Sequence, residues 1–163
     1  MIQRIQTLYL LLAFAFCLAC LCLPIAHFVV NDVQAGALSG LWESYSQVDM
    51  YNLWFVSEGK HVFYFCPVLM GILVITTALA FIDIWLYKRR ALQMRLATFS
   101  MILLVFWYIA YAVISLYLVS PTLMLFRPHW TAALPAAALV LLYLAFRGIL
   151  KDEMLVRSLD RLR

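Results

Sequence analysis

Four long apolar segments constrain this chain more than any other feature. They cover approximately residues 8–30, 61–87, 96–119 and 130–149, and most of the polar stretches between them are short. Because a helix rises about 1.5 Å per residue, about 20 apolar residues cross the ~30 Å hydrocarbon core of a bilayer. The composition agrees, since 67% of the 163 residues are hydrophobic and 12% are charged, against roughly half and a quarter in soluble domains. The chain is predicted to be one membrane domain with four spans.

A basic stretch between the second and third segments sets the predicted topology. Residues 86–96 are too charged to lie in a bilayer and too short to form a domain, so we interpret them as a tight cytoplasmic turn. With the N-terminus on the same side, ten of the 12 Lys and Arg residues are cytoplasmic: Arg4, Lys88, Arg89, Arg90, Arg95, Arg147, Lys151, Arg157, Arg161 and Arg163. Only Lys60 and Arg127 lie outside. The positive-inside rule therefore predicts that both termini are cytoplasmic.

The connections predict how the spans are arranged. Spans joined by tight turns run antiparallel, so we expect an all-α, polytopic four-helix bundle. Residues 31–60 form a small outer loop region, in which residues 51–56 are compatible with a short strand or an interfacial helix. Pro24 should kink the first span or mark its exit, and Pro67 falls in the first turns of the second span, where proline is tolerated.

The charged tail, residues 150–163, is predicted to continue the fourth span as a cytoplasmic helix. Glu153 and Arg157 are four residues apart in the favourable order, and three leucines from Leu155 onward recur at helical spacing. Such a helix could lie on the anionic inner leaflet or pack against a partner. The acidic residues mixed among its basic ones weaken the pure lipid-surface interpretation.

The cysteines suggest the sharpest chemical hypothesis. Cys17, Cys20, Cys22 and Cys66 all lie in apolar sequence, and the last two fall toward the outer side. Four-helix membrane thiol oxidoreductases exist, but a reactive thiolate needs a polar, electropositive site. Cysteine is also a common small apolar residue in cores. We therefore favour structural cysteines, and the sequence leaves a redox role open.

Asp83 is the one acid inside an apolar segment, where an ionisable residue suggests a function. A proton or ion relay would need further ionisable groups at the same depth, and no second acid or mid-membrane histidine accompanies it. Asp83 also lies within reach of Lys88, Arg89 or Arg90. A structural ion pair with the basic turn is the favoured interpretation.

The three histidines, His27, His61 and His129, all fall near the outer ends of spans. Imidazole is a common metal ligand, but no two of them have the i, i+4 spacing of a helical site and no carboxylate falls in register. We expect no metal site. We also expect no catalytic residue and no cofactor, because the chain contains no phosphate loop, dinucleotide fingerprint or nucleophile elbow. The net charge of +4 follows from the topology and does not indicate a nucleic-acid partner.

Several segments resemble one known family. They are residues 1–13, 87–96, 134–135 and 144–163, and the Lys-Asp-Glu…Asp-Arg-Leu-Arg ending is the most specific of them. Together they resemble the domain of unknown function 4293 family, small four-span inner-membrane proteins of Bacteroidetes-type bacteria. The resemblance covers essentially the whole chain, and it implies a bacterial inner membrane but no activity. The family-like residues that we expect to face a partner are Lys88, Arg89, Arg90, Gln93, Arg95, Lys151, Asp152, Glu153, Arg157, Asp160 and Arg161.

These observations favour a non-enzymatic accessory or scaffold subunit of an inner-membrane complex. Its partners would be the lipid bilayer and either other inner-membrane proteins or a second copy in a homodimer. One alternative is a lipid or quinone binder or carrier, whose aromatic third span lines a pocket at Tyr108 or Tyr111. A membrane thiol oxidoreductase is the third hypothesis.

Overall fold

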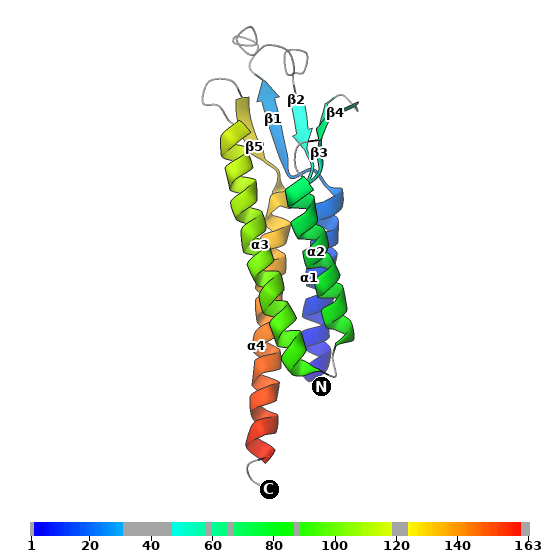
Figure 1. Ribbon diagram of the computed structural model, residues 1–163, viewed down its shortest axis with the longest axis vertical. Helices are drawn as coiled ribbons and strands as arrows, with labels where there is room; N and C mark the ends of the chain where they lie inside the picture. Colours follow the sequence, from blue (N-terminus) through cyan, green and yellow to red (C-terminus); the bar gives the residue numbers. More distant parts are fainter. Residues whose placement is uncertain are drawn as a thin grey trace.

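The computed structural model describes residues 2–30, 47–57, 60–64, 67–86, 89–118 and 124–160. Within these residues, four long helices form an elongated bundle, and a five-stranded antiparallel sheet extends from one end of it (Figure 1). Helix α1 begins and helix α4 ends at the opposite end of the bundle. We call these two ends the sheet end and the terminal end.

The four helices are α1 (Ile2–Cys22), α2 (Pro67–Trp85), α3 (Arg90–Leu118) and α4 (Leu134–Asp160), and the short 3-10 turn η2 (Trp130–Ala133) leads into α4. They run alternately up and down, each packs against the next, and α4 closes the ring against α1. All four are long and apolar enough to cross a membrane. The predicted four-helix membrane bundle is confirmed, and the fourth helix continues into the tail as expected.

Each helix buries a stripe of residues spaced alternately four and three apart. The stripes are Gln6, Leu10, Ala13, Cys17 and Cys20 on α1; Leu69, Leu73, Thr76, Ala80 and Asp83 on α2; Gln93, Ala97, Ser100, Leu104 and Trp107 on α3; and Ala138, Leu142, Ala145 and Ile149 on α4. This spacing is typical of helices that cross at about 20° in a left-handed bundle. In the stripes of α1, α2 and α3, the residue nearest the terminal end is polar: Gln6, Asp83 and Gln93.

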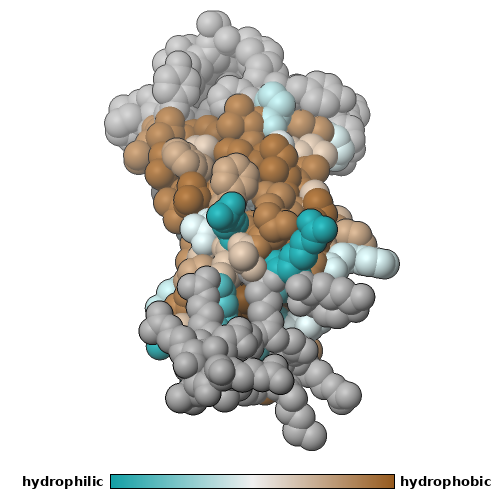
Figure 2. Space-filling view, turned by 60° about the horizontal axis from the view of Figure 1, so that its bottom comes forward, coloured by the Kyte–Doolittle hydropathy of each residue, from teal (hydrophilic) through white to brown (hydrophobic). Residues whose placement is uncertain are grey.

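The outward side chains of the helices are mostly large and apolar. Phe106, Val113 and Leu116, for example, are 56%, 59% and 76% exposed. In the space-filling view this surface forms a brown band, and hydrophilic residues lie nearer the terminal end (Figure 2). Exposed apolar surface of this extent is what a helix bundle presents to lipid.

The sheet consists of β1 (Ala26–Val30), β2 (Gln47–Met50), β3 (Trp54–Ser57), β4 (Lys60–Tyr64) and β5 (Met124–Pro128), in the order β4-β3-β2-β1-β5. Side chains alternate between its two faces. The inner face contributes to the core, since Ala26, Phe28 and Met50 are buried and the Phe28 ring packs 5.6 Å from that of Phe126. His27 and Asp49 point to the other face.

Strands occupy sequence that hydropathy assigned to spans or loops. Strand β1 lies inside the first predicted span, and most of β4 lies inside the second, because an apolar strand that continues a helix has the same composition as the helix. Helix α1 ends at Cys22, just before Pro24, and Pro67 is the first residue of α2. Residues 51–56 contain a turn followed by the start of β3. Helix α3 begins at Arg90, so residues 90–96 of the predicted basic turn are helical.

Candidate functional site

Strand pairing brings a histidine and a carboxylate together at the sheet end. His27 on β1 is the cross-strand partner of Asp49 on β2 and of Arg127 on β5. The His27 Nδ1 atom lies 2.6 Å from Asp49 Oδ1, and the two side chains are 25% and 35% exposed. His129 directly follows β5. Its ring is nearly perpendicular to that of His27, and the two ring centroids are 4.9 Å apart. Sequence reasoning missed this cluster because it looked for spacing along a helix, whereas a sheet holds these residues together.

A buried polar network joins the sheet end to the bundle core. Asn52, in the turn between β2 and β3, is 2% exposed. Its Nδ2 donates to the Cys20 carbonyl at 2.7 Å, and its Oδ1 accepts from Trp107 Nε1 at 3.2 Å. The Cys20 carbonyl needs this donor because residue 24, which would serve it in a continuing helix, is a proline without an N–H. Asn52 therefore satisfies a carbonyl in the last turn of α1 and ties this helix to α3.

The tyrosines proposed for a pocket belong to the core. The Tyr108 hydroxyl donates to the Ala132 carbonyl at 2.7 Å, and the Tyr111 hydroxyl donates to the Ile25 carbonyl at 3.4 Å. Both rings pack on Trp107, with centroids 5.1 Å and 5.4 Å away. Both hydroxyls thus donate to backbone carbonyls, and both rings pack against the Trp107 indole.

The described cysteines are free thiols of two kinds. Cys17 and Cys20 are buried in the stripe that α1 turns toward the bundle interior, and Cys22 is exposed. Cys66 lies outside the residues that the structure describes. A thiol in an apolar core is not the accessible thiolate that disulfide exchange requires, so Cys17 and Cys20 act here as small core residues.

Asp83 is fully buried near the terminal end of α2. Neither carboxylate oxygen has a hydrogen-bond partner in the part of the chain that the structure describes, and Gln93 Nε2 donates instead to the Asp83 backbone carbonyl at 3.1 Å. Arg89 is exposed to solvent. The side chains of Lys88 and Arg90 lie outside the described residues, so the ion pair between Asp83 and the basic turn stays a prediction.

A double-mutant cycle measures that ion pair. Asp83→Asn removes the charge with little change of shape, and Lys88→Met and Arg90→Met each remove one partner. We expect Asp83→Asn to lower the free energy of unfolding in bicelles. We also expect it to couple to one of the two basic substitutions by at least about 1 kcal/mol, because paired charges do not contribute additively. Additive effects with both would show that neither Lys88 nor Arg90 pairs with Asp83.

The residues predicted to face a partner fall into three groups. Two contribute to the bundle itself, since Gln93 is 6% exposed against Asp83, and Asp152 accepts a hydrogen bond from Gln6 Nε2 at 2.9 Å. The members at the surface are Arg89, Arg95 and Lys151, with Glu153 half-buried. The members whose side chains lie outside the described part of the chain are Lys88, Arg90, Arg157, Asp160 and Arg161.

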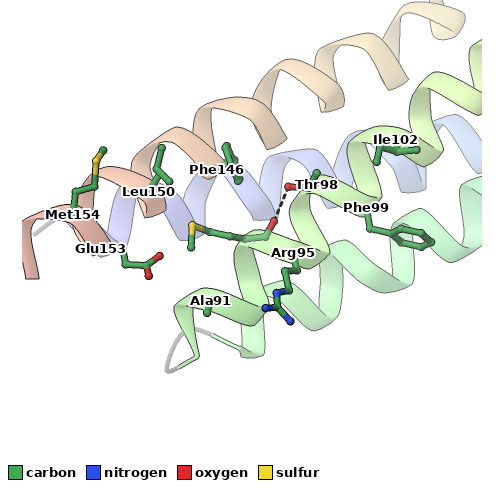
Figure 3. Close-up of a pocket in the computed structure, with 10 residues that line it drawn as sticks. Ala91, Arg95, Thr98, Phe99, Ile102, Phe146, Leu150, Glu153 and Met154 are labelled. Atoms are coloured by element: carbon green, nitrogen blue, oxygen red, sulfur yellow. Dashed lines mark hydrogen bonds between the residues drawn. The ribbon is translucent and has the colours of Figure 1, made fainter. Parts of the chain in front are cut away.

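A groove of about 640 Å³ lies between α3 and α4 toward the terminal end (Figure 3). Ala91, Met94, Arg95, Thr98, Phe99 and Ile102 line it from α3, and Phe146, Leu150, Glu153 and Met154 line it from α4. Most of these side chains are apolar. The Thr98 hydroxyl donates a hydrogen bond to the Met94 carbonyl at 2.8 Å. Arg95 and Glu153 are the charged residues of the lining. We call this feature the α3–α4 groove.

Comparison with known proteins gives a family and no activity. A search of curated proteins finds no match to the chain. The family model described as a domain of unknown function (DUF4293) matches residues 2–162, which is nearly the whole chain. Because this match covers nearly the whole chain, the protein with these four apolar helices and this sheet belongs to the DUF4293 family.

Proposed function

We propose that this protein is a non-enzymatic accessory or scaffold subunit of an inner-membrane complex, and that its protein partner docks in the α3–α4 groove. The observation that carries the proposal is the projection of α4 beyond the other helices at the terminal end (Figure 1), where residues of α4 also line the α3–α4 groove (Figure 3).

Helix α4 is longer than a membrane crossing requires. Its 27 residues extend about 40 Å, against a hydrocarbon core of ~30 Å. The bond from Gln6 to Asp152 ties the start of the projecting part to α1. Just beyond that tie, Met154 lines the groove and is 57% exposed. A large apolar side chain presented on an anchored helix favours a partner that covers it.

The chemistry of the groove suits an amphipathic helix of the partner. Phe146, Leu150 and Met154 line the groove with apolar side chains on α4, and Arg95 and Glu153 add one basic and one acidic side chain to the lining. An amphipathic helix can lay its apolar side into such a groove and pair its flanking charges at the edges. A surface that bound only anionic lipid headgroups would favour basic residues alone.

The same proposal places the terminal end in the cytoplasm. Arg89 immediately precedes α3, Arg95 lies in the first turns of α3, and Lys151 lies in the half of α4 nearer the terminal end, whereas Lys60 and Arg127 belong to strands at the sheet end. The positive-inside rule then puts both termini in the cytoplasm and the sheet on the outer side of a bacterial inner membrane.

Purification of the tagged chain from native membranes in a mild detergent tests the docking surface. The wild-type chain should co-purify with a stoichiometric protein partner. Met154→Glu should lower the recovery of that partner at least about tenfold, because burying an unpaired carboxylate in an apolar contact costs more than about 1.4 kcal/mol. Leu155→Glu is the matched control, since it adds the same charge one residue further on, outside the groove lining, and should retain the partner.

Two results would oppose the proposal. A wild-type chain recovered as a clean monomer or homodimer would remove the accessory-subunit role. Equal partner recovery from Met154→Glu and Leu155→Glu would remove the α3–α4 groove as the docking surface. Gel filtration of both variants checks that the membrane domain remains folded.

The apolar lining of the groove also favours a second candidate, in which an acyl chain or quinone tail lies between α3 and α4. In that case native mass spectrometry of the purified protein should detect one tightly bound lipid or quinone per chain. Met154→Glu should then release the small molecule without changing which proteins co-purify.

A further inference from the structure

We propose that His27 and His129 bind a divalent transition-metal ion of the Zn²⁺ or Cu²⁺ class at the sheet end, with Asp49 orienting one of the two imidazoles. The inference is independent of the proposed docking function, which concerns the opposite end of the bundle. It rests on the protonation pattern of the two rings, on their spacing and on their access to solvent.

The hydrogen bonds of His27 assign its free nitrogen. An ionised carboxylate only accepts hydrogen bonds, so His27 Nδ1 donates to Asp49 Oδ1 across the 2.6 Å contact. In the neutral ring the lone pair is then on Nε2, the atom that would bind a metal ion. A carboxylate on the far nitrogen of a metal-binding histidine is the common supporting arrangement, because it fixes the tautomer and makes the ring a better ligand.

The hydrogen bonds of His129 lead to the same tautomer. The Thr131 hydroxyl donates its single hydrogen to the Pro24 carbonyl. Its oxygen therefore accepts from His129 Nδ1, which lies 2.9 Å away. In the neutral ring His129 Nε2 also carries a lone pair. The fold thus holds two neighbouring histidines through their Nδ1 atoms, and in the neutral ring each carries its lone pair on Nε2.

The spacing of the rings matches shared coordination. Their centroids are 4.9 Å apart and their planes meet at 86°. With Zn–N bonds of about 2.1 Å and tetrahedral angles, two imidazoles on one ion have centroids roughly 5 Å apart. Strand β1, which carries His27, and the residue between β5 and η2, which is His129, therefore already hold the two rings at this separation.

The site would be open on the solvent side. Within the described ranges, no group of three or more His, Cys, Asp or Glu side chains could hold a metal ion. The protein would thus supply two ligands and leave the other positions to water or an external ligand. The His27 side chain is 25% exposed, which gives an ion access. Imidazole ligands favour Zn²⁺, Cu²⁺ or Ni²⁺ over Mg²⁺ and Ca²⁺, which prefer oxygen.

Cu²⁺ added to the purified full chain, without a polyhistidine tag, provides the test. Pulsed electron paramagnetic resonance should count two bound imidazoles in the wild-type protein, and calorimetry should give one Zn²⁺ per chain. His27→Gln and His129→Gln should each reduce the affinity for Zn²⁺ at least about tenfold, and Asp49→Asn should reduce it roughly 10–100-fold. His61→Gln is the matched control, since β4 lies three strand spacings, about 14 Å, from β1; it should change nothing.

Several results would overturn the site. A wild-type spectrum with one imidazole or none would do so without reliance on any variant. So would Zn²⁺ binding that survives His129→Gln, or an equal loss in His61→Gln. Circular dichroism of each variant separates loss of the ligand from loss of the fold.

Discussion

Replacing Asn52 with leucine should lower the free energy of unfolding by about 3 kcal/mol. Leucine has a similar volume but can neither donate nor accept a hydrogen bond. The substitution leaves the Cys20 carbonyl and the Trp107 N–H without partners in the core, and each unpaired buried group costs roughly 1–3 kcal/mol. Pro24 prevents the helix from supplying a replacement donor to Cys20. Unfolding of the purified protein by heat or by SDS titration measures the loss.

Two further variants make that result specific. Thr98→Ala removes an exposed hydroxyl that bonds within its own helix, and it should change stability by less than about 0.5 kcal/mol. Trp107→Phe should cost much less in the Asn52→Leu background than alone, because its hydrogen-bond partner has already gone. An Asn52→Leu protein as stable as wild type would mean that this network does not hold α1 against α3.

Gly148→Leu should lower the melting temperature by about 5 °C or more. A Cβ atom at this position would lie 3.0 Å from Gln6 Cγ and 3.1 Å from its Nε2. The branched side chain of leucine would displace the Gln6 side chain from Asp152 and overpack the contact between α1 and α4. Overpacking of this kind costs roughly 1–3 kcal/mol, which corresponds to several degrees in a domain of this size.

Gly71→Leu is the matched control for Gly148→Leu. Gly71 lies on α2, and a Cβ there would meet nothing within 4 Å. Both substitutions exchange a helical glycine for the same side chain, so they share any change in helix propensity. Only the substitution at the seam between α1 and α4 should destabilise the bundle, and equal melting temperatures for the two variants would argue against close packing at Gly148.

Hydropathy was sufficient to predict the four helices, because a continuous run of about 20 apolar residues is the length that a helix needs to cross a membrane. Their ends depended on local chemistry that the sequence also carries: α1 ends just before Pro24, and α2 begins at Pro67. The sheet was not predictable in the same way. Strands β1 and β5 pair residues about 100 positions apart, such as Phe28 and Phe126, and their apolar composition merges with that of the neighbouring helices.

The same physical reason explains which site residues sequence reasoning found. Asp83 stands out in a linear sequence because a lone acid in an apolar helix is unusual. The His27–Asp49 contact does not stand out, because it depends on the register between β1 and β2, which no pattern in either strand specifies. Gln93 was expected to face a partner because it is one of the family-like residues, yet the spacing of the α3 stripe turns it inward to Asp83.

Contact between a partner protein and the α3–α4 groove is the central claim, and site-specific photocrosslinking measures it most directly. A benzoylphenylalanine at position 154, irradiated in native membranes, should form one discrete protein adduct. The same probe in place of Leu116, an α3 residue 76% exposed on the apolar surface toward the sheet end, should not form it. Adducts with lipid alone at position 154, or the same products at both positions, would contradict the claim that this groove docks a protein.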